Sequence, residues 1–170
     1  MTDDLLSALS SLRATRWFTD RDVDDAVLHR VLAAARWTGS ARNRQPWRFH
    51  TARDPATRAE LSRCGAYAAH LTAAPVVLLL ALDRTGADAE FDGGRVAQNI
   101  MLAAHLLGLG CCPVTFFPED NARRATELAG LAAPWLVRTG IALGHPAPAP
   151  SGRSAIPTGR LPLADLWTGD

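Results

Sequence analysis

The stretch Ser40–Phe49, SARNRQPWRF, lies between a strongly patterned helical segment and a segment typical of a strand. It begins polar and ends in Pro46, which restricts the backbone, and Trp47, which offers a large flat apolar face. Asn43 and Gln45 carry amides that both donate and accept hydrogen bonds. A polar loop held between two regular elements is a frequent place for binding residues. This stretch therefore predicts a site for a planar ligand with heteroatoms along its edge.

The elements on either side of this loop are readily predicted. Val23–Trp37 is expected to be a helix, because its apolar residues recur on one face and its charges lie opposite. Asp24 is a candidate cap at its start, and Gly39 is a natural stop just past its end. The segment after the loop, Trp47–Ala52, is expected to be a strand. The loop is thus predicted to join a helix to a strand.

The remaining segments predict an α+β domain. Val76–Leu82 is a continuous apolar run without alternation, which is typical of a central strand covered on both faces. Long helices mixed with about four strands, without βαβ alternation, favour α+β architecture, and the length of 170 residues favours one domain over 1–170. Within it, 1–20 is expected to form an N-terminal helix and arm, and 146–170 a C-terminal extension. The other predicted helices are Asp3–Leu12, Pro55–Cys64, Tyr67–Ala73, Gly94–Leu107 and Glu119–Gly130, and the other predicted strands are Cys111–Phe117 and Trp135–Leu143.

After Arg95, the helix expected at Gly94–Leu107 is apolar almost all the way round, with Gln98, Asn99 and His105 as its polar positions. A helix that is apolar on all sides must be buried on all sides. In so small a domain this pattern favours a partner subunit. A central helix inside a monomer is the alternative. The polar loop Asp83–Asp92 is expected to precede this helix.

Charge and composition exclude several functions. The net charge of +1 gives no reason to expect nucleic acid or an acidic membrane as a partner, although Arg42, Arg44 and Arg48 surround Trp47. All 18 basic residues are arginine, so lysine Schiff-base chemistry is excluded. The acidic N-terminus without a long apolar core is not expected to be a secretory signal, and no apolar run approaches the length of a membrane span. The expectation is a cytoplasmic protein.

The side chains that usually carry catalysis are not arranged in a known catalytic or metal-binding pattern. The three cysteines, Cys64, Cys111 and Cys112, have no metal-binding spacing and are expected to be reduced, and no metal is predicted. There is no GxSxG, no HExxH and no glycine-rich phosphate loop, and the histidines are more often structural in such contexts. We therefore name no catalytic residue. A polar and aromatic pocket without its own nucleophile and base suits a bound cofactor that carries the chemistry.

Several short motifs follow one another in a recognisable order. They are the arm with Arg13, Arg16 and Phe18, the Ser40-x-x-Asn43-x-Gln45-Pro46-Trp47 loop, Gln98-Asn99, Gly108-Leu109-Gly110, Leu143-Gly144-His145-Pro146, and Arg160-Leu161-Pro162-Leu163. In this order and spacing the chain resembles the FMN-dependent nitroreductase family over nearly its whole length. The resemblance implies a nitroreductase-like fold with a central mixed or antiparallel sheet, flanked by helices. It also implies an intertwined homodimer with its active sites at the interface.

The resemblance further implies an activity and a set of cofactor contacts. The expected reaction is hydride transfer from NADH or NADPH to FMN and then to a small-molecule acceptor such as a nitroaromatic or quinone, in ping-pong order. Asn43 would face the pyrimidine edge of the flavin with Ser40 and Gln45 close by, and Arg16 would lie near the N1/O2 end of the ring or near the ribityl chain. The other expected contacts are Arg13 and Arg160 for the phosphate, and Pro113, Val114 and Thr115 beside the ring and its N5.

The chain departs from the family pattern at four positions, one of which is Gly39, where proline is common. Leu12 and Ala14 replace an arginine and a serine that normally help to hold the phosphate, and Phe116 stands where glycine is common near N5. We expect Phe116 to narrow the ring face. The loss at positions 12 and 14 motivates a second hypothesis, a nitroreductase-like protein that binds or sequesters flavin without turnover. Within the enzyme class, a flavin dehydrogenase of an amino-acid-derived or heterocyclic substrate stays open.

Overall fold

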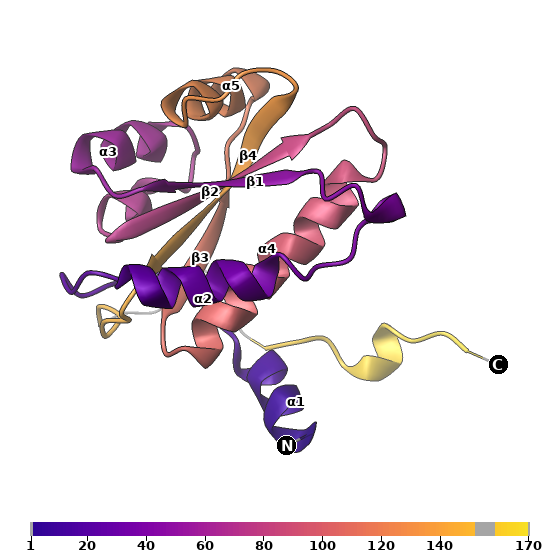
Figure 1. The fold of residues 1–170 in the computed structure, drawn as a ribbon. Coiled ribbons are helices and arrows are strands. Elements are labelled where there is room, and N and C mark those ends of the chain that lie inside the picture. Colours follow the sequence, from indigo (N-terminus) through magenta and orange to yellow (C-terminus); the bar gives the residue numbers. More distant parts are fainter. Residues whose placement is uncertain (1, 152–158, 170) are drawn as a thin grey trace.

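The computed structural model describes residues 2–151 and 159–169. Its centre is a four-stranded sheet in the order β1-β2-β4-β3, with every neighbouring pair antiparallel. Figure 1 shows helices on both faces of this sheet. The α+β prediction and the four predicted strands are thereby confirmed. The strands are β1 (Trp47–Ala52), β2 (Val76–Asp83), β3 (Gly110–Thr115) and β4 (Trp135–Gly144).

The helices divide the core into two layers. α2 and α4 cover one face of the sheet, and α3 and α5 cover the other (Figure 1). The central strand β2 is buried along nearly its whole length, as its unbroken apolar run predicts. The described helices are α1 (Thr2–Ser11), α2 (Asp25–Ala35), α3 (Pro55–Arg63), α4 (Ala89–Leu106) and α5 (Glu119–Leu128), with 3-10 turns η1 (Ala41–Asn43), η2 (Ala69–Thr72) and η3 (Leu163–Asp165).

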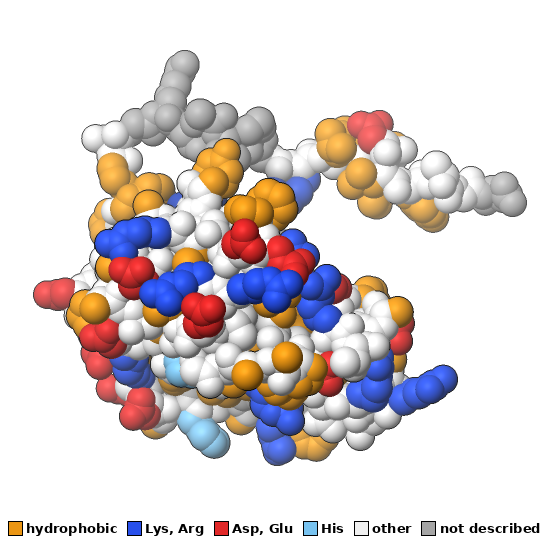
Figure 2. Space-filling view, turned by 90° about the horizontal axis from the view of Figure 1, so that it is seen from above, with side chains coloured by type: hydrophobic (Ala, Val, Ile, Leu, Met, Phe, Trp, Pro, Cys, Tyr) orange, Lys and Arg blue, Asp and Glu red, His pale blue; other side chains and the backbone are white. Residues whose placement is uncertain are grey.

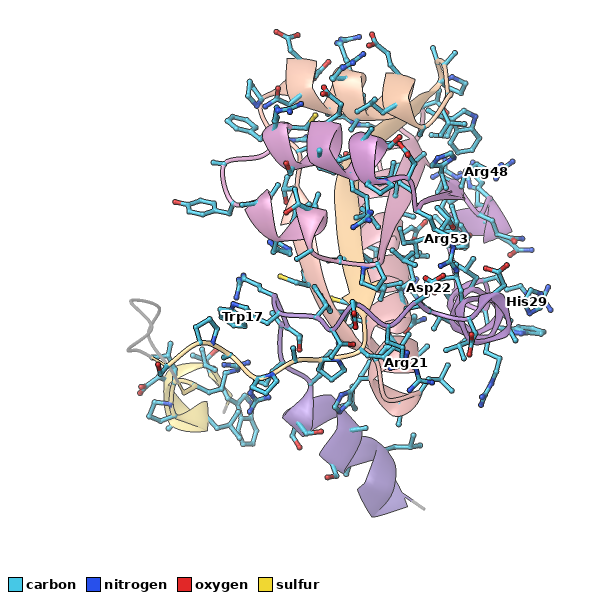
Figure 3. All side chains as sticks on the ribbon, turned by 90° about the vertical axis from the view of Figure 1, so that its left-hand side faces the viewer. Trp17, Arg21, Asp22, His29, Arg48 and Arg53 are labelled. Carbon is cyan, nitrogen blue, oxygen red and sulfur yellow. The ribbon has the colours of Figure 1, made fainter. Side chains whose placement is uncertain are left out.

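The start of α2 differs from the prediction in its capping. Asp24 occupies the N-cap position, but its side chain makes no capping hydrogen bond. Asp22 instead accepts a hydrogen bond from the backbone of Val23, and Arg53 bridges the carboxylates of Asp22 and Asp25. Figure 3 shows Asp22 and Arg53 side by side where the end of the N-terminal arm meets β1. An ion-pair bridge therefore ties this helix start to the sheet.

The helix α4 begins at Ala89, within the segment expected to be a loop. The helix continues through the pair Gly93-Gly94, although glycine weakens a helix. A Cβ at Gly93 would lie 2.5 Å from Cδ1 of Leu82, so this glycine allows close packing of α4 on β2. The inner face of the helix is buried, whereas Phe91 is 71% exposed and Leu106 58% exposed on the rest of it. The single chain therefore does not bury this helix on all sides.

The two ends of the chain follow different paths. The N-terminal arm runs along the edge of the sheet, where the Thr15 N–H donates to the Cys111 carbonyl at 2.7 Å and the Thr19 N–H to the His145 carbonyl at 2.9 Å. The segment 159–169 extends away from the body (Figures 1 and 2). Its apolar side chains Leu161, Leu163, Leu166 and Trp167 are all exposed. The part of the predicted C-terminal extension at 152–158 lies outside the described residues.

Within the described residues, no helix combines the length and the apolar character that crossing a membrane requires.

Candidate functional site

The N-terminal arm places Arg16 beside the edge strand β3. Arg16 lines a cavity of about 380 Å³ together with Pro113, Val114 and Thr115 of that strand. Four of the residues predicted from the sequence are thus brought to one place. The other side chains around this cavity, which we call the β3 cavity, are Ala66, Tyr67, His70, Cys112 and Phe117.

The β3 cavity contains a histidine that the sequence did not single out. Burial lowers the pKa of His70, and the charge of Arg16 lowers it further, while backbone carbonyls of Tyr67 and Cys112 act in the opposite direction. Its Nε2 atom is buried and has no hydrogen-bond partner among the described residues. The imidazole is therefore neutral at pH 7. No sequence motif surrounds His70. Its place at the cavity becomes visible only in the structure, where η2 passes beside β3.

The neighbouring thiols are protonated. Burial raises the pKa of Cys112, although the charge of Arg16 acts against it, and burial raises the pKa of Cys111 to about 11. A thiol with a raised pKa is a poor nucleophile at neutral pH, because the thiolate is the reactive form. The cysteines beside the cavity are therefore packing residues in this chain.

The two phenylalanines after β3 point to different places. Phe116 is fully buried and packs over Gly140, where an added Cβ would lie 2.8 Å from the Phe116 ring. Phe117 is 65% exposed and lines the β3 cavity. The expectation that Phe116 narrows the ring face is wrong, because its side chain turns into the core. The adjacent Phe117 takes the place at the cavity.

A second group of predicted residues forms a compact loop before β1. The backbone N–H of Gln45 donates to Ser40 Oγ at 2.9 Å, and the Gln45 side-chain amide donates to Asn43 Oδ1 at 3.2 Å. Arg42, Asn43 and Gln45 all have φ between 50° and 53°, in the left-handed region. This conformation costs about 1 kcal/mol or more for each residue that is not glycine, and such strain is concentrated at ligand sites. The amides of Asn43 and Gln45 remain exposed.

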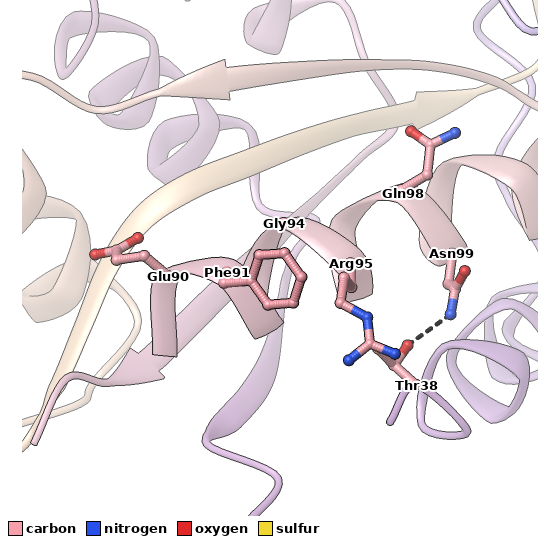
Figure 4. Close-up of a pocket in the computed structure, with 7 residues that line it drawn as sticks. All are labelled: Thr38, Glu90, Phe91, Gly94, Arg95, Gln98 and Asn99. Carbon is pink, nitrogen blue, oxygen red and sulfur yellow. Dashed lines mark hydrogen bonds between the residues drawn. The ribbon is translucent and has the colours of Figure 1, made fainter. Parts of the chain in front are cut away.

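The helix α4 flanks this loop and forms a second cavity, of about 520 Å³. Figure 4 shows the hydrogen bond at 2.7 Å from the Asn99 amide to Thr38 Oγ1, which ties the helix to the start of the loop. Arg95 donates to the Gly39 carbonyl at 2.8 Å. Both side chains of the Gln98-Asn99 motif therefore line the cavity, and Asn99 also supports the loop. The lining of this α4 cavity is Thr38, Glu90, Phe91, Gly94, Arg95, Gln98 and Asn99.

The two groups of residues lie at opposite edges of the sheet. The loop 40–45 leads into the edge strand β1, and the β3 cavity lies against the other edge strand. With three strand spacings between them, the edge strands are about 14 Å apart. A single chain therefore does not bring Asn43 and Arg16 together.

The two arginines predicted to bind phosphate lie apart from the β3 cavity. Arg13 donates to the carbonyls of Ser10 and Leu12, and Arg160 donates to the Gly159 carbonyl on the extended C-terminal segment. Leu12 packs against the core layer of α2 and α4. Ala14 pairs with Cys111 through the backbone. The departure at position 12 thus serves packing, whereas the backbone pairing at position 14 does not depend on the alanine side chain.

Comparison with known proteins covers nearly the whole chain. The model of the nitroreductase family matches residues 9–64 and 62–145. The chain is 30% identical to a protein of Thermus thermophilus named NADH dehydrogenase, covering 96% of both chains. It is 29% identical over 96% of its length, and 88% of the relative's, to a protein of Methanothermobacter thermautotrophicus whose name includes NAD(P)H nitroreductase.

A solved structure gives the same result for the fold. A protein of Desulfovibrio desulfuricans crystallised in complex with FMN is 30% identical and superposes with a TM-score of 0.84, covering 98% of this chain and 96% of that one. The family match, the relatives and the shared fold agree, and they agree with the order of motifs along the sequence. The chain belongs to the nitroreductase family.

Proposed function

We propose that the protein is an FMN-dependent oxidoreductase that uses NADH or NADPH to reduce small acceptors such as nitroaromatics or quinones. The observation that carries this proposal is the β3 cavity, where Arg16 meets Pro113, Val114 and Thr115. The relatives' names and the FMN complex of the Desulfovibrio protein support it. In this proposal the reaction has ping-pong order: NADH or NADPH binds and reacts first, and its oxidised form leaves before the acceptor binds.

We further propose that each flavin site is built from two copies of the chain. The β3 cavity of one copy would face the loop 40–45 of its partner, because one chain holds these groups at opposite sheet edges. The exposed side chains Phe91 and Leu106 of α4, and the apolar residues of the C-terminal segment, supply surface for such a dimer. In such an assembly we propose Arg13 and Arg160 as the residues that bind the phosphate of FMN.

The residues present fit a flavin. Arg16 supplies a positive charge that stabilises negative charge on the pyrimidine end of the reduced ring. The exposed amides of Asn43 and Gln45 donate to and accept from the edge of the ring, and strand β3 provides an extended wall along it. When bound, FMN supplies the atom that accepts a hydride and passes it on. The chain's own residues bind, orient and polarise.

The direct test uses the purified protein incubated with FMN and desalted. A retained flavin spectrum, followed by oxidation of NADH or NADPH with a quinone as acceptor, is the expected result. Asn43→Ala and Arg16→Gln should each reduce turnover about tenfold or more, since each removes a hydrogen bond or charge at the ring. Arg123→Gln on α5, an exposed arginine paired with Glu119, is the matched control. Flavin-loaded protein that never oxidises either nicotinamide contradicts the proposal.

The second candidate is a flavin-binding protein without turnover. Leu12 and Ala14 favour it, because the arm lacks the polar groups that the family pattern places there. Under this reading Asn43→Ala changes only the affinity for FMN, and the wild-type protein retains flavin without consuming NADH or NADPH. The same two assays therefore separate the two functions.

A further inference from the structure

Asp92 is a buried carboxylate directly behind the loop 40–45. It is 1% exposed, and it is the only acidic side chain so deeply buried among the residues whose burial the structure describes. Its Oδ2 accepts a hydrogen bond from the Ala41 N–H at 3.0 Å, and its Oδ1 lies 3.5 Å from the Arg95 guanidinium. A buried charge is stable only when it is paired and hydrogen-bonded. The loop therefore supplies part of what this carboxylate requires.

Asp92 is one of four residues, at the N-cap of α4 and along it, whose side chains form hydrogen bonds or ion pairs with the loop 40–45 or the two residues before it. Positions 88, 92, 95 and 99 are separated by four, three and four residues, so they lie along one face of the helix. The loop runs antiparallel along this face. The pairs are Asp88 with Arg44 at 3.3 Å, Asp92 with Ala41, Arg95 with the carbonyl of Gly39, and Asn99 with Thr38.

Asp92 is the most deeply buried residue in these contacts. Asp88 and Arg44 are both well exposed, so their ion pair is screened by water and contributes little. Asp92 is shielded from water, and its loss would leave the Ala41 N–H without its acceptor and Arg95 without its buried partner. The left-handed residues Arg42 and Asn43 follow Ala41 directly, so this hydrogen bond anchors the start of the strained segment.

We propose that Asp92 is a positioning residue that holds the loop in its left-handed conformation and thereby presents Asn43 and Gln45. The carboxylate does not reach the exposed amide edge, so it acts through the Ala41 backbone and Arg95. Its effect on FMN rests on the function proposed above, whereas its effect on the loop does not.

The test compares Asp92→Ala with Glu127→Ala in the full-length protein. Glu127 is the matched control, because it also pairs with an arginine three residues away on a helix, Arg124, but is exposed and lies on the other face of the sheet. Trypsin should cut after Arg42 or Arg44 about tenfold faster in Asp92→Ala than in the wild type, and the Kd for FMN should rise about tenfold or more. Asp92→Asn keeps a carbonyl oxygen for the Ala41 N–H and should recover part of both losses. Glu127→Ala should change neither.

Arg95→Leu provides a second variant in case Asp92→Ala fails to fold. Arg95 is about half exposed, so its replacement leaves the core intact, yet it removes the donor to Gly39 and the partner of Asp92. It should also speed cleavage after Arg42 or Arg44. Wild-type rates of cleavage in both Asp92→Ala and Arg95→Leu would overturn the proposal. If the two variants are cleaved faster but the wild-type protein binds no FMN, the positioning role of Asp92 is supported and the proposed flavin function is contradicted.

Discussion

His70 and Arg16 give the β3 cavity a defined charge at neutral pH. The arginine is charged, whereas burial and the arginine itself keep the imidazole neutral. A cavity with one fixed positive charge suits a ligand that gains negative charge on reduction. Among the residues that line the cavity, the positive charge therefore comes from Arg16, whereas His70 contributes a neutral imidazole.

The lowered pKa of His70 predicts how stability depends on pH. The unfolded chain binds a proton on this histidine below about pH 6.5, while the folded chain resists it, so the unfolded state binds more protons there. The free energy of unfolding should therefore fall as the pH is lowered from 7.5 to 5.5. Urea unfolding at both values tests this, and His70→Gln should show a smaller fall. If the free energy of unfolding of His70→Gln falls as much as that of the wild type, groups other than His70 cause the pH dependence.

At the scale of elements, the arm depends on a glycine in β3. A Cβ at Gly110 would lie 2.7 Å from Cγ2 of Thr15 and 2.9 Å from its Cβ. The arm can therefore approach β3 closely enough to pair with Cys111 and to place Arg16 at the cavity. The Gly108-Leu109-Gly110 motif thus has a packing role that its spacing alone does not reveal.

Gly110→Ala should push the arm away from β3. We expect a loss of about 1 to 3 kcal/mol in the free energy of unfolding, which is typical of overpacking, and weaker FMN binding because Arg16 moves with the arm. Urea unfolding and flavin titration measure the two effects. Adding Thr15→Ala removes the nearest atom and should restore part of each. If Gly110→Ala alone is as stable as the wild type and binds FMN as tightly, the position of the arm does not depend on its close approach to Gly110.

The sequence predicted the elements better than their boundaries. Apolar periodicity located α2, and the unbroken run at Val76–Leu82 identified the central strand, because burial in the core fixes both patterns. The start of α4 was placed five residues too late, since the contact of Gly93 with Leu82 depends on how two distant elements pack. The same limit explains Phe116 and Phe117, whose opposite directions depend on the space above Gly140.

The candidate site was predictable only where a family motif marks it. The motifs singled out Arg16, Asn43 and the strand 113–115. His70 and Asp92 have no local signal, because their roles arise from burial next to a loop and a cavity that other segments form. Whether Arg13 and Arg160 hold the phosphate remains a prediction for the assembled dimer.

For the whole molecule, the surface is uneven in a way that favours a dimer. The side carrying α3 and α5 is covered by interspersed arginine and acidic side chains, as Figure 2 shows, and several form ion pairs. The outer face of α4 and the C-terminal segment expose large apolar side chains instead. Extended apolar surface of this kind marks an interaction site.

Leu106→Glu should therefore disrupt the dimer. A carboxylate buried at an apolar interface without a partner should weaken association about 100-fold or more. Sedimentation should give twice the chain mass of 18.2 kDa for the wild type and the single-chain mass for the variant at low micromolar concentration. Ala132→Glu, an exposed site beyond α5, is the control and should remain dimeric. A monomeric wild type would contradict the assembly.

The most direct test of a flavin site shared between two chains is complementation between Arg16→Gln and Asn43→Ala. Each variant alone should retain little FMN. If each site takes Arg16 from one chain and Asn43 from its partner, a heterodimer of the two variants contains one intact site and one doubly defective site. Co-expressed with different tags and purified through both, it should retain half the FMN of the wild-type dimer and oxidise NADH or NADPH at half its rate. A heterodimer as defective as its parents would place both residues in the site of a single chain and contradict the account.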